Sequence, residues 1–380
     1  MTIRHATEAD LDTMLAMVAH SRGLMRANGN MTQWTGYPLA DDLLEDIRLG
    51  VSYIIDGTAT FALVPGVEPT YGYIDHGRWI DPDSPYATIH RLAKTAGAKD
   101  VSHEVFAFSK QQYSYLRADT HADNRPMRHI LEREGFVECG TVYMSDGAPR
   151  QAYEWWRWDE VPADIRDFVE QKVIPQYRHF DAAHNERHVR RVIARAMKIL
   201  PGTQAPSPAS PRGTWRPESV FIAAAMHDLG LAYCRERHHL ESGRIIRACG
   251  ELRQWFNNTE IEDIAQAAED HRASANQPPH SLLGCIVAEA DRDIEPETIV
   301  RRTVEYGLSH YPELDREGHW QRTLQHLHEK YAEGGYIKLW LDNSPNAAPL
   351  AELRAIINDE PRLRTLFDLI MENPSITNNP

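Results

Sequence analysis

The pattern of apolar and polar residues changes character along the chain. In the first part, apolar residues recur at helical spacing over 7–18 and predict an amphipathic helix. β-rich runs at 52–64 and 71–77 predict strands, with a hairpin turn at Asp56-Gly57. Shorter segments of both kinds follow: a strand at 88–93, a helix from Ser102, a strand at 115–118, a helix at 124–134 and a closing strand from Phe136. This alternation predicts an α/β fold.

Beyond Trp158 the strand signals nearly vanish. Long apolar patterns at helical spacing predict helices over 165–180, 188–200, 219–234, 239–256, 261–272 and 281–294. Residues 200–217 are rich in Pro, Gly and Ser, and composition alone would place a domain boundary there. A set of histidines described below spans this segment, so we interpret it as an exposed loop inside an all-α domain. We expect an α/β domain over 1–158 and a helical domain over 159–380.

Charge and composition exclude several classes of function. The 380 residues include 41 Lys and Arg against 55 Asp and Glu, a formal net charge of −14. Because phosphate backbones are held by clustered cations, this balance argues against a nucleic-acid partner. The first residues carry acids where a signal peptide needs an apolar stretch, and no run approaches the ~18 apolar residues of a membrane helix. The four cysteines show no paired spacing, so we expect a cytoplasmic protein without a membrane partner.

The helical half places histidines and aspartates on or beside separate predicted helices, as a metal site requires. The candidate metal ligands are His188, His227, Asp228, His239, His271 and Asp291. Imidazole and carboxylate together suit Zn, Mn, Fe or Ni, and a carboxylate such as Asp228 can bridge two ions. The apolar run AAAMHDLG predicts burial of the His-Asp pair, where an unpaired charge is costly and a metal offsets that cost.

Three segments carry a resemblance in the same order: His188 in HNERHVRRV, the His-Asp pair of MHDLG and Asp291 in EADRD. Across residues 162–300 they resemble the HD superfamily of metal-dependent phosphohydrolases. The resemblance implies that the helical domain is an enzyme that hydrolyses a small phosphoester or nucleotide with one or two metal ions. It makes His227 and Asp228 catalytic and implies a first ion held by these two with His188 and Asp291, and further ligands at His239 and His271.

Some of these assignments leave alternatives open. His184 and His188 are one helical turn apart, and we favour His188 because it begins the apolar run. His238 and His239 cannot both face inward, and the family spacing favours His239. His271 is equally well explained as a ligand or as an ordinary surface residue.

Arginines near these residues suit phosphate recognition, although each one alone is better explained by a surface ion pair. The candidates are Arg187, Arg190, Arg191, Arg195, Arg272 and Arg292.

The first domain carries a second resemblance, strongest in YATIHRLA and in the stretch from RADTHADNRP to QAYEW. It resembles the GNAT family of acyl-CoA-dependent N-acetyltransferases across residues 1–156. The resemblance implies two splayed parallel strands, with residues 88–93 exposed to an acetyl-CoA cofactor, and a small amine as acceptor. The cofactor-binding residues it implies are Leu92, Ala98, Lys99, Val101, Ser102 and Asn124.

Two departures from the GNAT pattern bear on activity. The loop KTAGAKDVS has only Gly97 and Ala98 as small residues, and Asp100 places a negative charge where pyrophosphate would bind. Leu131 stands where many relatives have a tyrosine. For the acceptor side, QWTGYP at 33–38 and Trp79 are candidates for a pocket, with Glu104 and Tyr143 as options for proton transfer; aromatic residues at such points also serve as ordinary core.

These observations favour a bifunctional enzyme. The alternative is a sensor, in which the helical domain binds metal and nucleotide without turnover and the α/β domain is a degenerate interaction module. A homo-oligomer remains open.

Overall fold

The computed structural model describes residues 2–55, 57–181, 183–199, 216–272 and 277–372. It divides the chain into two compact units, Met1–Asp159 and Glu160–Pro380. The division lies one residue beyond the expected boundary. Most of the predicted loop at 200–217, and Asp56 of the predicted hairpin turn, lie outside the described residues.

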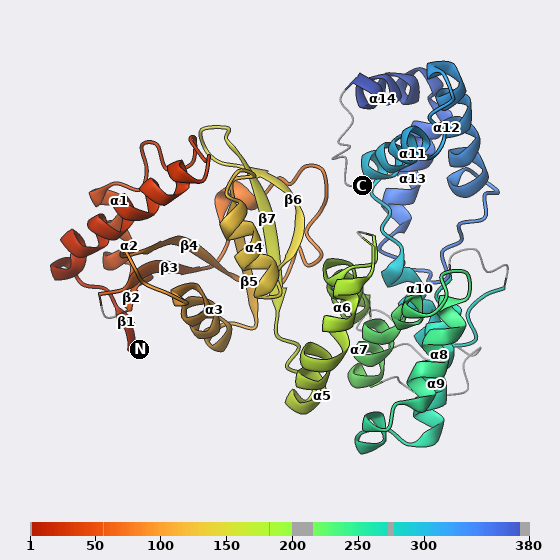
Figure 1. Ribbon diagram of the computed structural model, residues 1–380, viewed down its shortest axis with the longest axis horizontal. Helices are drawn as coiled ribbons and strands as arrows, with labels where there is room; N and C mark the ends of the chain where they lie inside the picture. Colours follow the sequence, from red (N-terminus) through yellow and green to blue (C-terminus); the bar gives the residue numbers. More distant parts are fainter. Residues whose placement is uncertain (1, 56, 182, 200–215, 273–276, 373–380) are drawn as a thin grey trace. The chain divides into compact units, whose positions relative to one another are not determined.

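The first unit is built on a seven-stranded sheet in the order β1-β2-β3-β4-β5-β7-β6 (Figure 1). Its neighbouring strands are antiparallel except for β4 and β5, which are parallel. The strands are β1 Ile3–His5, β2 Ser52–Ile55, β3 Ala59–Pro65, β4 Ala87–Lys94, β5 Tyr115–Thr120, β6 Val137–Tyr143 and β7 Pro149–Trp156.

Helices cover both faces of this sheet because side chains alternate along each strand. Ile54 packs with α1 (Leu11–Ala27) and α2 (Ala40–Arg48) in one apolar cluster. The next residue, Ile55, belongs to the cluster on the other face, with α3 (Val101–Gln112) and α4 (Arg125–Arg133). Helix α1 confirms the helix predicted at 7–18, whereas α2 was not predicted.

The run at 71–77 is not the strand that its sequence predicts. Its first residue ends a short 3₁₀ helix, Pro69–Tyr71, and its one pairing is an isolated bridge between Asp75 and Thr141. Tyr71 instead packs its ring 5.2 Å from that of Trp79 and donates a hydrogen bond to Asp119 at 2.8 Å. Tyr71 therefore packs in an apolar cluster against the sheet instead of forming a strand.

The second unit is helical, and no strand occurs among its described residues. The α/β unit followed by a helical unit confirms the expected fold class. The helices are α5 Ala163–Phe168, α6 Glu186–Ile199, α7 Pro217–Met226, α8 His238–Ala248, α9 Asn258–Asp270, α10 Leu282–Asp291, α11 Pro296–His310, α12 Arg316–Tyr331, α13 Ala347–Asn358 and α14 Glu360–Glu372. None of the helices in the described ranges is long and apolar enough to cross a membrane.

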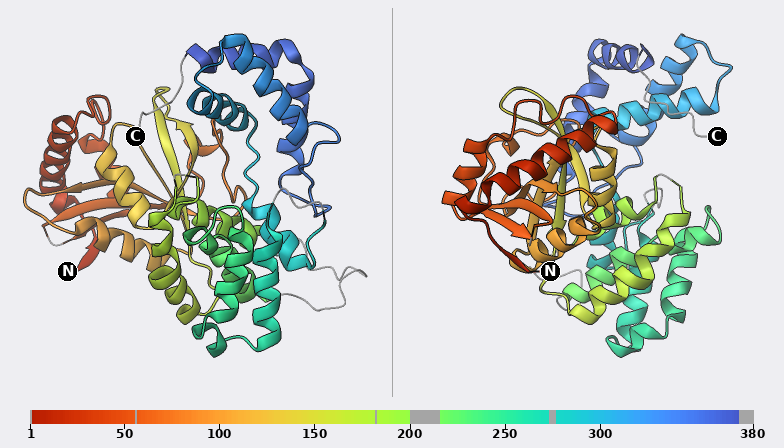
Figure 2. Two further views of the ribbon diagram at one scale, coloured as in Figure 1. Left: turned by 45° about the vertical axis from the view of Figure 1, so that its right-hand side comes forward. Right: turned by 60° about the vertical axis from the view of Figure 1, so that its left-hand side comes forward.

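The helices α6–α14 form two groups in the figures, green to cyan (α6–α10) and blue (α11–α14), and the chain after α10 leads from one group to the other (Figures 1 and 2). Helix α7 is the centre of the first group, because every residue from Ser219 to Met226 is buried. The second group has its own apolar core, which begins at Ile294 and includes Leu327, Leu353 and Phe367.

A buried carboxylate joins the two groups. Glu289 of α10 is fully buried and accepts hydrogen bonds from the backbone of Trp340 and the side chains of Ser344 and Asn346, at 2.5, 2.5 and 3.3 Å. Arg292 donates to the same carboxylate at 3.1 Å. The charge is therefore compensated, and the segment before α13 is fixed to α10.

Candidate metal centre and acyl-transfer cavity

Six imidazole and carboxylate side chains from five helical segments converge in the second unit. Their parent segments are α6, the end of α7, the start of α8, the end of α9 and the end of α10, and the residues are His188, His227, Asp228, His238, His271 and Asp291. His227, His271 and Asp291 lie at helix C-termini, where the helix dipole is negative and favours a bound cation.

The first half of this cluster surrounds a point between α6, α7 and α10. The His188 Nε2 atom lies 3.5 Å from Asp228 Oδ2 and 3.3 Å from Asp291 Oδ1. The His227 Nε2 atom lies 3.3 and 3.6 Å from the same two oxygens. Ligands about 2.1 Å from one tetrahedral ion are separated by roughly 3.4 Å, so this spacing fits a single divalent cation.

The second half of the cluster uses the other oxygen of the same aspartate. Asp228 Oδ1 lies 3.4 Å from His238 Nε2 and 3.3 Å from His271 Nε2. Oδ1 is buried and has no hydrogen-bond partner. An orphaned carboxylate oxygen facing two imidazoles fits a second cation, which Asp228 would share with the first.

Backbone hydrogen bonds fix which nitrogen of these histidines faces the cluster. The Nδ1 atoms of His227, His238 and His271 lie 2.8, 2.7 and 2.5 Å from the carbonyl oxygens of the residues three positions earlier. A carbonyl only accepts, so each Nδ1 carries the proton and donates. In the neutral ring Nε2 is then a bare lone pair. The Nε2 atoms of His238 and His271 face each other at 3.2 Å, where two bare lone pairs repel unless a cation, or a proton on one ring, lies between them.

Close packing of the HDLG segment brings α8 to the cluster. A Cβ atom at Gly230 would lie 2.0 Å from the His238 carbonyl oxygen, so only glycine permits this approach. The Gly230 amide donates to Ser242 of α8 at 2.9 Å. Below the cluster, the buried Tyr177 hydroxyl donates to the Ala225 carbonyl at 2.8 Å and accepts from the Asp228 amide at 3.4 Å. These contacts hold the His-Asp pair in place.

The charges of the cluster are strongly coupled. Burial opposes a charge on His227, but the carboxylates of Asp228 and Asp291 outweigh it and raise the pKa of His227 well above its ordinary value. Burial would also raise the pKa values of both aspartates, yet the facing imidazoles lower them well below the ordinary range. At His238 burial dominates and lowers the pKa, so this imidazole is neutral near pH 7, as a ligand must be.

In the first unit, the parallel strands β4 and β5 separate soon after they meet. They pair only at Ala87–Leu116 and Thr88–Arg117, while β4 stays paired with β3 as far as Lys94. The edge of β4 that faces β5 is therefore free of β5 over 89–94. This is the splayed geometry that the GNAT resemblance implies.

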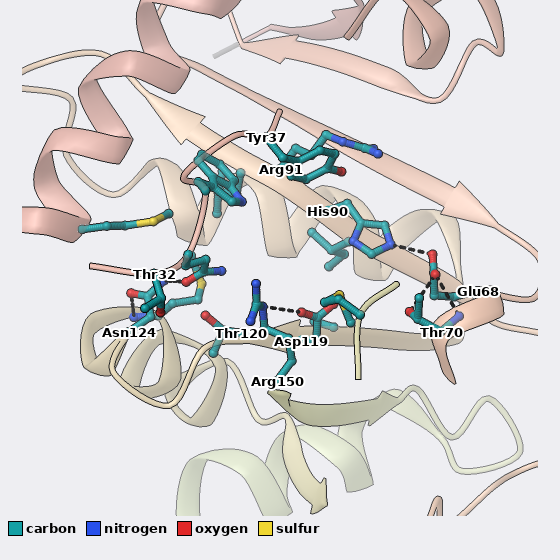
Figure 3. A pocket seen from close by; sticks show the side chains of 18 of the residues that line it. Thr32, Tyr37, Glu68, Thr70, His90, Arg91, Asp119, Thr120, Asn124 and Arg150 are labelled. Atoms are coloured by element: carbon teal, nitrogen blue, oxygen red, sulfur yellow. Dashed lines mark hydrogen bonds and ion pairs between the residues drawn. The ribbon is translucent and has the colours of Figure 1, made fainter. Parts of the chain in front are cut away.

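A cavity of about 560 Å³ opens where these strands diverge (Figure 3). Leu92 and Asn124 line it, as do the residues of QWTGYP from Gln33 to Tyr37. Asn124 caps α4 by accepting from the Met127 amide at 3.4 Å. The other predicted cofactor-binding residues lie on the segment from β4 to the first turn of α3, and the cavity lining does not include them: Ala98, Lys99, Val101 and Ser102.

Comparisons with known proteins bear on both units. Residues 186–294 match the HD domain family. The comparison with curated proteins finds no match.

Among solved structures, the chain is similar to a GNAT-family acetyltransferase from Streptococcus agalactiae, at 28% identity and a TM-score of 0.38, over 41% of this chain and 95% of that one. It is similar to a ribosomal-protein-alanine N-acetyltransferase from Brucella melitensis, at 20% identity and a TM-score of 0.29, over 41% and 100%. It is also similar to Mycobacterium smegmatis RimJ in complex with CoA-disulfide, at 17% identity and a TM-score of 0.26, over 42% and 83%. The chain thus joins an α/β unit that resembles these acetyltransferases to a helical unit that contains an HD domain.

Within the HD domain, the structure replaces one predicted ligand. His238, and not His239, faces Asp228 and His271. Successive residues on a helix point about 100° apart, and α8 begins at His238, so the inward direction falls on its first residue. His239 is not among the clustered groups, and its Nδ1 is buried without a hydrogen-bond partner in the described part of the chain. The sequence spacing could not fix this because it does not show where α8 begins.

Most of the arginines near the HD ligands are engaged in ion pairs. Arg190 pairs with Glu170 at 2.6 Å, and Arg195 pairs with Asp293 at 2.5 Å. Arg272 donates to the Glu236 carbonyl at 3.0 Å. The remaining candidates lie along a cavity next to the metal cluster: Arg187, Arg191 and Arg292.

Two residues of the GNAT-like cavity were not predicted from the sequence. His90 of β4 faces Glu68, with 3.2 Å between His90 Nε2 and Glu68 Oε2, at the end of the pocket opposite Asn124 (Figure 3). The hydrogen bond with His90 lowers the pKa of Glu68 to about 2. Burial alone would raise this pKa, and hydrogen bonds from Thr70 also lower it. A histidine within the apolar strand YATIHRLA was the available signal.

The residues considered for the acceptor side are placed differently. Glu104 and Tyr143 are not part of the cavity lining, and Tyr143 donates instead to Asp75 at 3.2 Å. Trp79 is core, with the Arg117 guanidinium 4.0 Å from its ring centre.

Proposed function

We propose that the HD domain is a metal-dependent phosphohydrolase that uses two divalent transition-metal ions, drawn from Mn, Fe, Ni and Zn, to cleave a small phosphoester. The observation that carries this is the pair of bare Nε2 atoms of His238 and His271 beside the orphaned oxygen of Asp228. Five of the six converging residues were predicted from the sequence, and the family match supports the same chemistry.

The proposed metal ligands form two half-sites. Asp228 links them through its two oxygens, His188, His227 and Asp291 complete one, and the remaining two histidines complete the other. When bound, divalent cations at such a centre supply hydroxide near neutral pH and neutralise phosphoryl charge. The helix C-termini and the backbone-anchored imidazoles hold the ligand atoms in place before substrate arrives.

Metal analysis and a substrate screen test this function. We expect protein purified without added ions to carry a transition metal, and manganese- or nickel-loaded protein to release phosphate from at least one phosphomonoester, phosphodiester or nucleotide. Metal binding without release from any substrate would favour the sensor alternative. Absence of a transition metal, even after loading, would remove the premise of both.

We also propose that the first unit binds acetyl-CoA and transfers its acetyl group to a small amine. The unpaired edge of β4 beside a 560 Å³ cavity supports this, because an extended pantetheine arm can pair with a free strand edge. The facing pair of His90 and Glu68 supplies a base, with the carboxylate orienting the imidazole as it accepts a proton from the amine.

Calorimetry tests the acetyl-CoA site directly. We expect one acetyl-CoA to bind per chain, more tightly than 3′-phosphoadenosine 5′-diphosphate, which lacks the pantetheine arm. His90→Ala should bind acetyl-CoA like the wild type, because the backbone of β4 and not this ring would pair with the pantetheine arm, but should lower any acetyl transfer by about 10²-fold or more. Undetectable acetyl-CoA binding, or equal binding of the two compounds, would contradict the proposal.

A further inference from the structure

A second cavity, of about 400 Å³, opens beside the first half of the metal cluster. Two of the proposed metal ligands, His188 and Asp291, are part of its lining. Cationic side chains from beyond the HD match also line it: Arg302 on α11 and Lys330 on α12. No motif in the sequence predicts chemistry for this C-terminal region.

Apolar packing holds these cations next to the metal cluster. Ile294, three residues after Asp291, belongs to the same buried cluster as Tyr331 and Ile337, on either side of the turn that follows α12. Lys330 precedes Tyr331 directly, and Asp291 is the acidic group near enough to act on its ammonium. The position of Lys330 relative to Asp291 is therefore set by the core and not by a flexible loop.

The cations that line this cavity differ in whether an acidic side chain forms an ion pair with them. Arg191 pairs with Asp293 at 2.7 Å, and Arg292 pairs with the buried Glu289 at 3.1 Å. Arg302 and Lys330 make no ion pair within 4 Å in the part of the chain that the structure describes. Asp293 acts on Arg302, and Asp291 on Lys330, only beyond ion-pair distance. Two cations without a close acidic partner, facing a cavity at a metal cluster, are suited to an anionic group of a ligand.

We propose that Arg302 and Lys330 form a subsite for a second anionic group of the substrate, so that the HD centre acts on a small phosphoester that carries a further phosphoryl or carboxylate group. This rests on the proposed hydrolase function and narrows its substrate class. The scissile phosphoryl group lies at the metal cluster, and the second anion points toward α11 and α12.

The lining also indicates the size of the ligand. The cavity lies at the small end of the range typical of small-molecule sites. Among its described lining residues the one phenol or indole ring is that of Tyr331, which is 8% exposed. A nucleobase binds by stacking on exposed aromatic rings, whereas the lining of this cavity presents charged side chains. A compact bisphosphate or phospho-carboxylate fits better than a nucleotide.

Phosphonates, which are not hydrolysed, separate this subsite from catalysis. We would titrate manganese-loaded protein with methylphosphonate, methylenediphosphonate and phosphonoacetate by calorimetry. We expect a compound with two anionic groups to bind at least about 10-fold more tightly than methylphosphonate, as a charge-assisted hydrogen bond allows. Preference for the diphosphonate would identify a second phosphoryl group, and preference for phosphonoacetate would identify a carboxylate.

Variants assign the preference to residues. Lys330→Met and Arg302→Met should each reduce it by about fivefold, and the double variant should bring all three compounds within about twofold. Lys338→Met is the matched control, because this lysine also follows the HD match but does not line the cavity. Metal content should be unchanged in all four proteins.

The outcomes separate the two proposals. If the wild type shows no preference, or the double variant keeps it, the subsite is wrong even where phosphoesters are hydrolysed. If no phosphoester is hydrolysed but the preference depends on Lys330, the subsite stands as a ligand site and the hydrolase function falls.

Discussion

Asp228→Asn should deplete metal from both half-sites and lower phosphoester hydrolysis by about 10³-fold or more. The carboxylate offers one oxygen to each half of the cluster, so the amide disturbs both at once. Removing metal-based charge stabilisation costs several kcal/mol, and each 1.4 kcal/mol is about tenfold in rate. Metal analysis of the purified variant and its turnover on the best substrate of the screen are the measurements.

A matched control separates this effect from a general loss of charge. Asp167→Asn makes the same chemical change at an exposed position on α5. It should retain metal and turnover. An Asp228→Asn protein that keeps both ions and more than about a tenth of its activity would show that the aspartate does not bridge.

His238→Ala should remove one of two bound ions and lower turnover by about 10²-fold, whereas His239→Ala should change neither by more than about twofold. The two residues are neighbours on α8, yet only the His238 Nε2 atom faces Asp228 and His271. Metal stoichiometry measured on both variants gives the answer without a substrate.

Two results would contradict the expectation for His238 and His239. If His239→Ala loses the ion and His238→Ala retains it, the family spacing was the better guide and α8 begins in a different phase. If neither variant changes the stoichiometry, the second half-site holds no ion, and the proposed centre is reduced to the first.

The sequence was informative where chemistry and periodicity coincide. His188, the His-Asp pair and Asp291 were found because each follows or begins an apolar helical pattern in a fixed order. The ambiguity at His238 and His239 could not be settled, because the direction of each side chain depends on where α8 begins, and this helix start packs closely against Gly230. Periodicity does not contain that contact.

Residues that act from distant segments were outside the reach of the sequence. His90 and Glu68 are 22 positions apart, and only the pairing of β3 with β4 brings their segments together. Lys330 is 39 positions beyond Asp291 in a region with no motif, and a shared apolar core places it at the cavity. The aromatic run at 71–77 was misread because aromatic residues favour strands and also fill the edges of a sheet.

The family boundary at residue 294 is not a boundary of folding. Ile294 belongs to the core of the helices that follow, and Glu289 takes three of its hydrogen-bond donors from Trp340, Ser344 and Asn346. A fragment cut at this point would keep the ligands but would leave a buried carboxylate short of donors, which costs several kcal/mol, and an apolar surface facing water. We therefore expect the HD domain of this chain to fold stably only together with the helices that follow it.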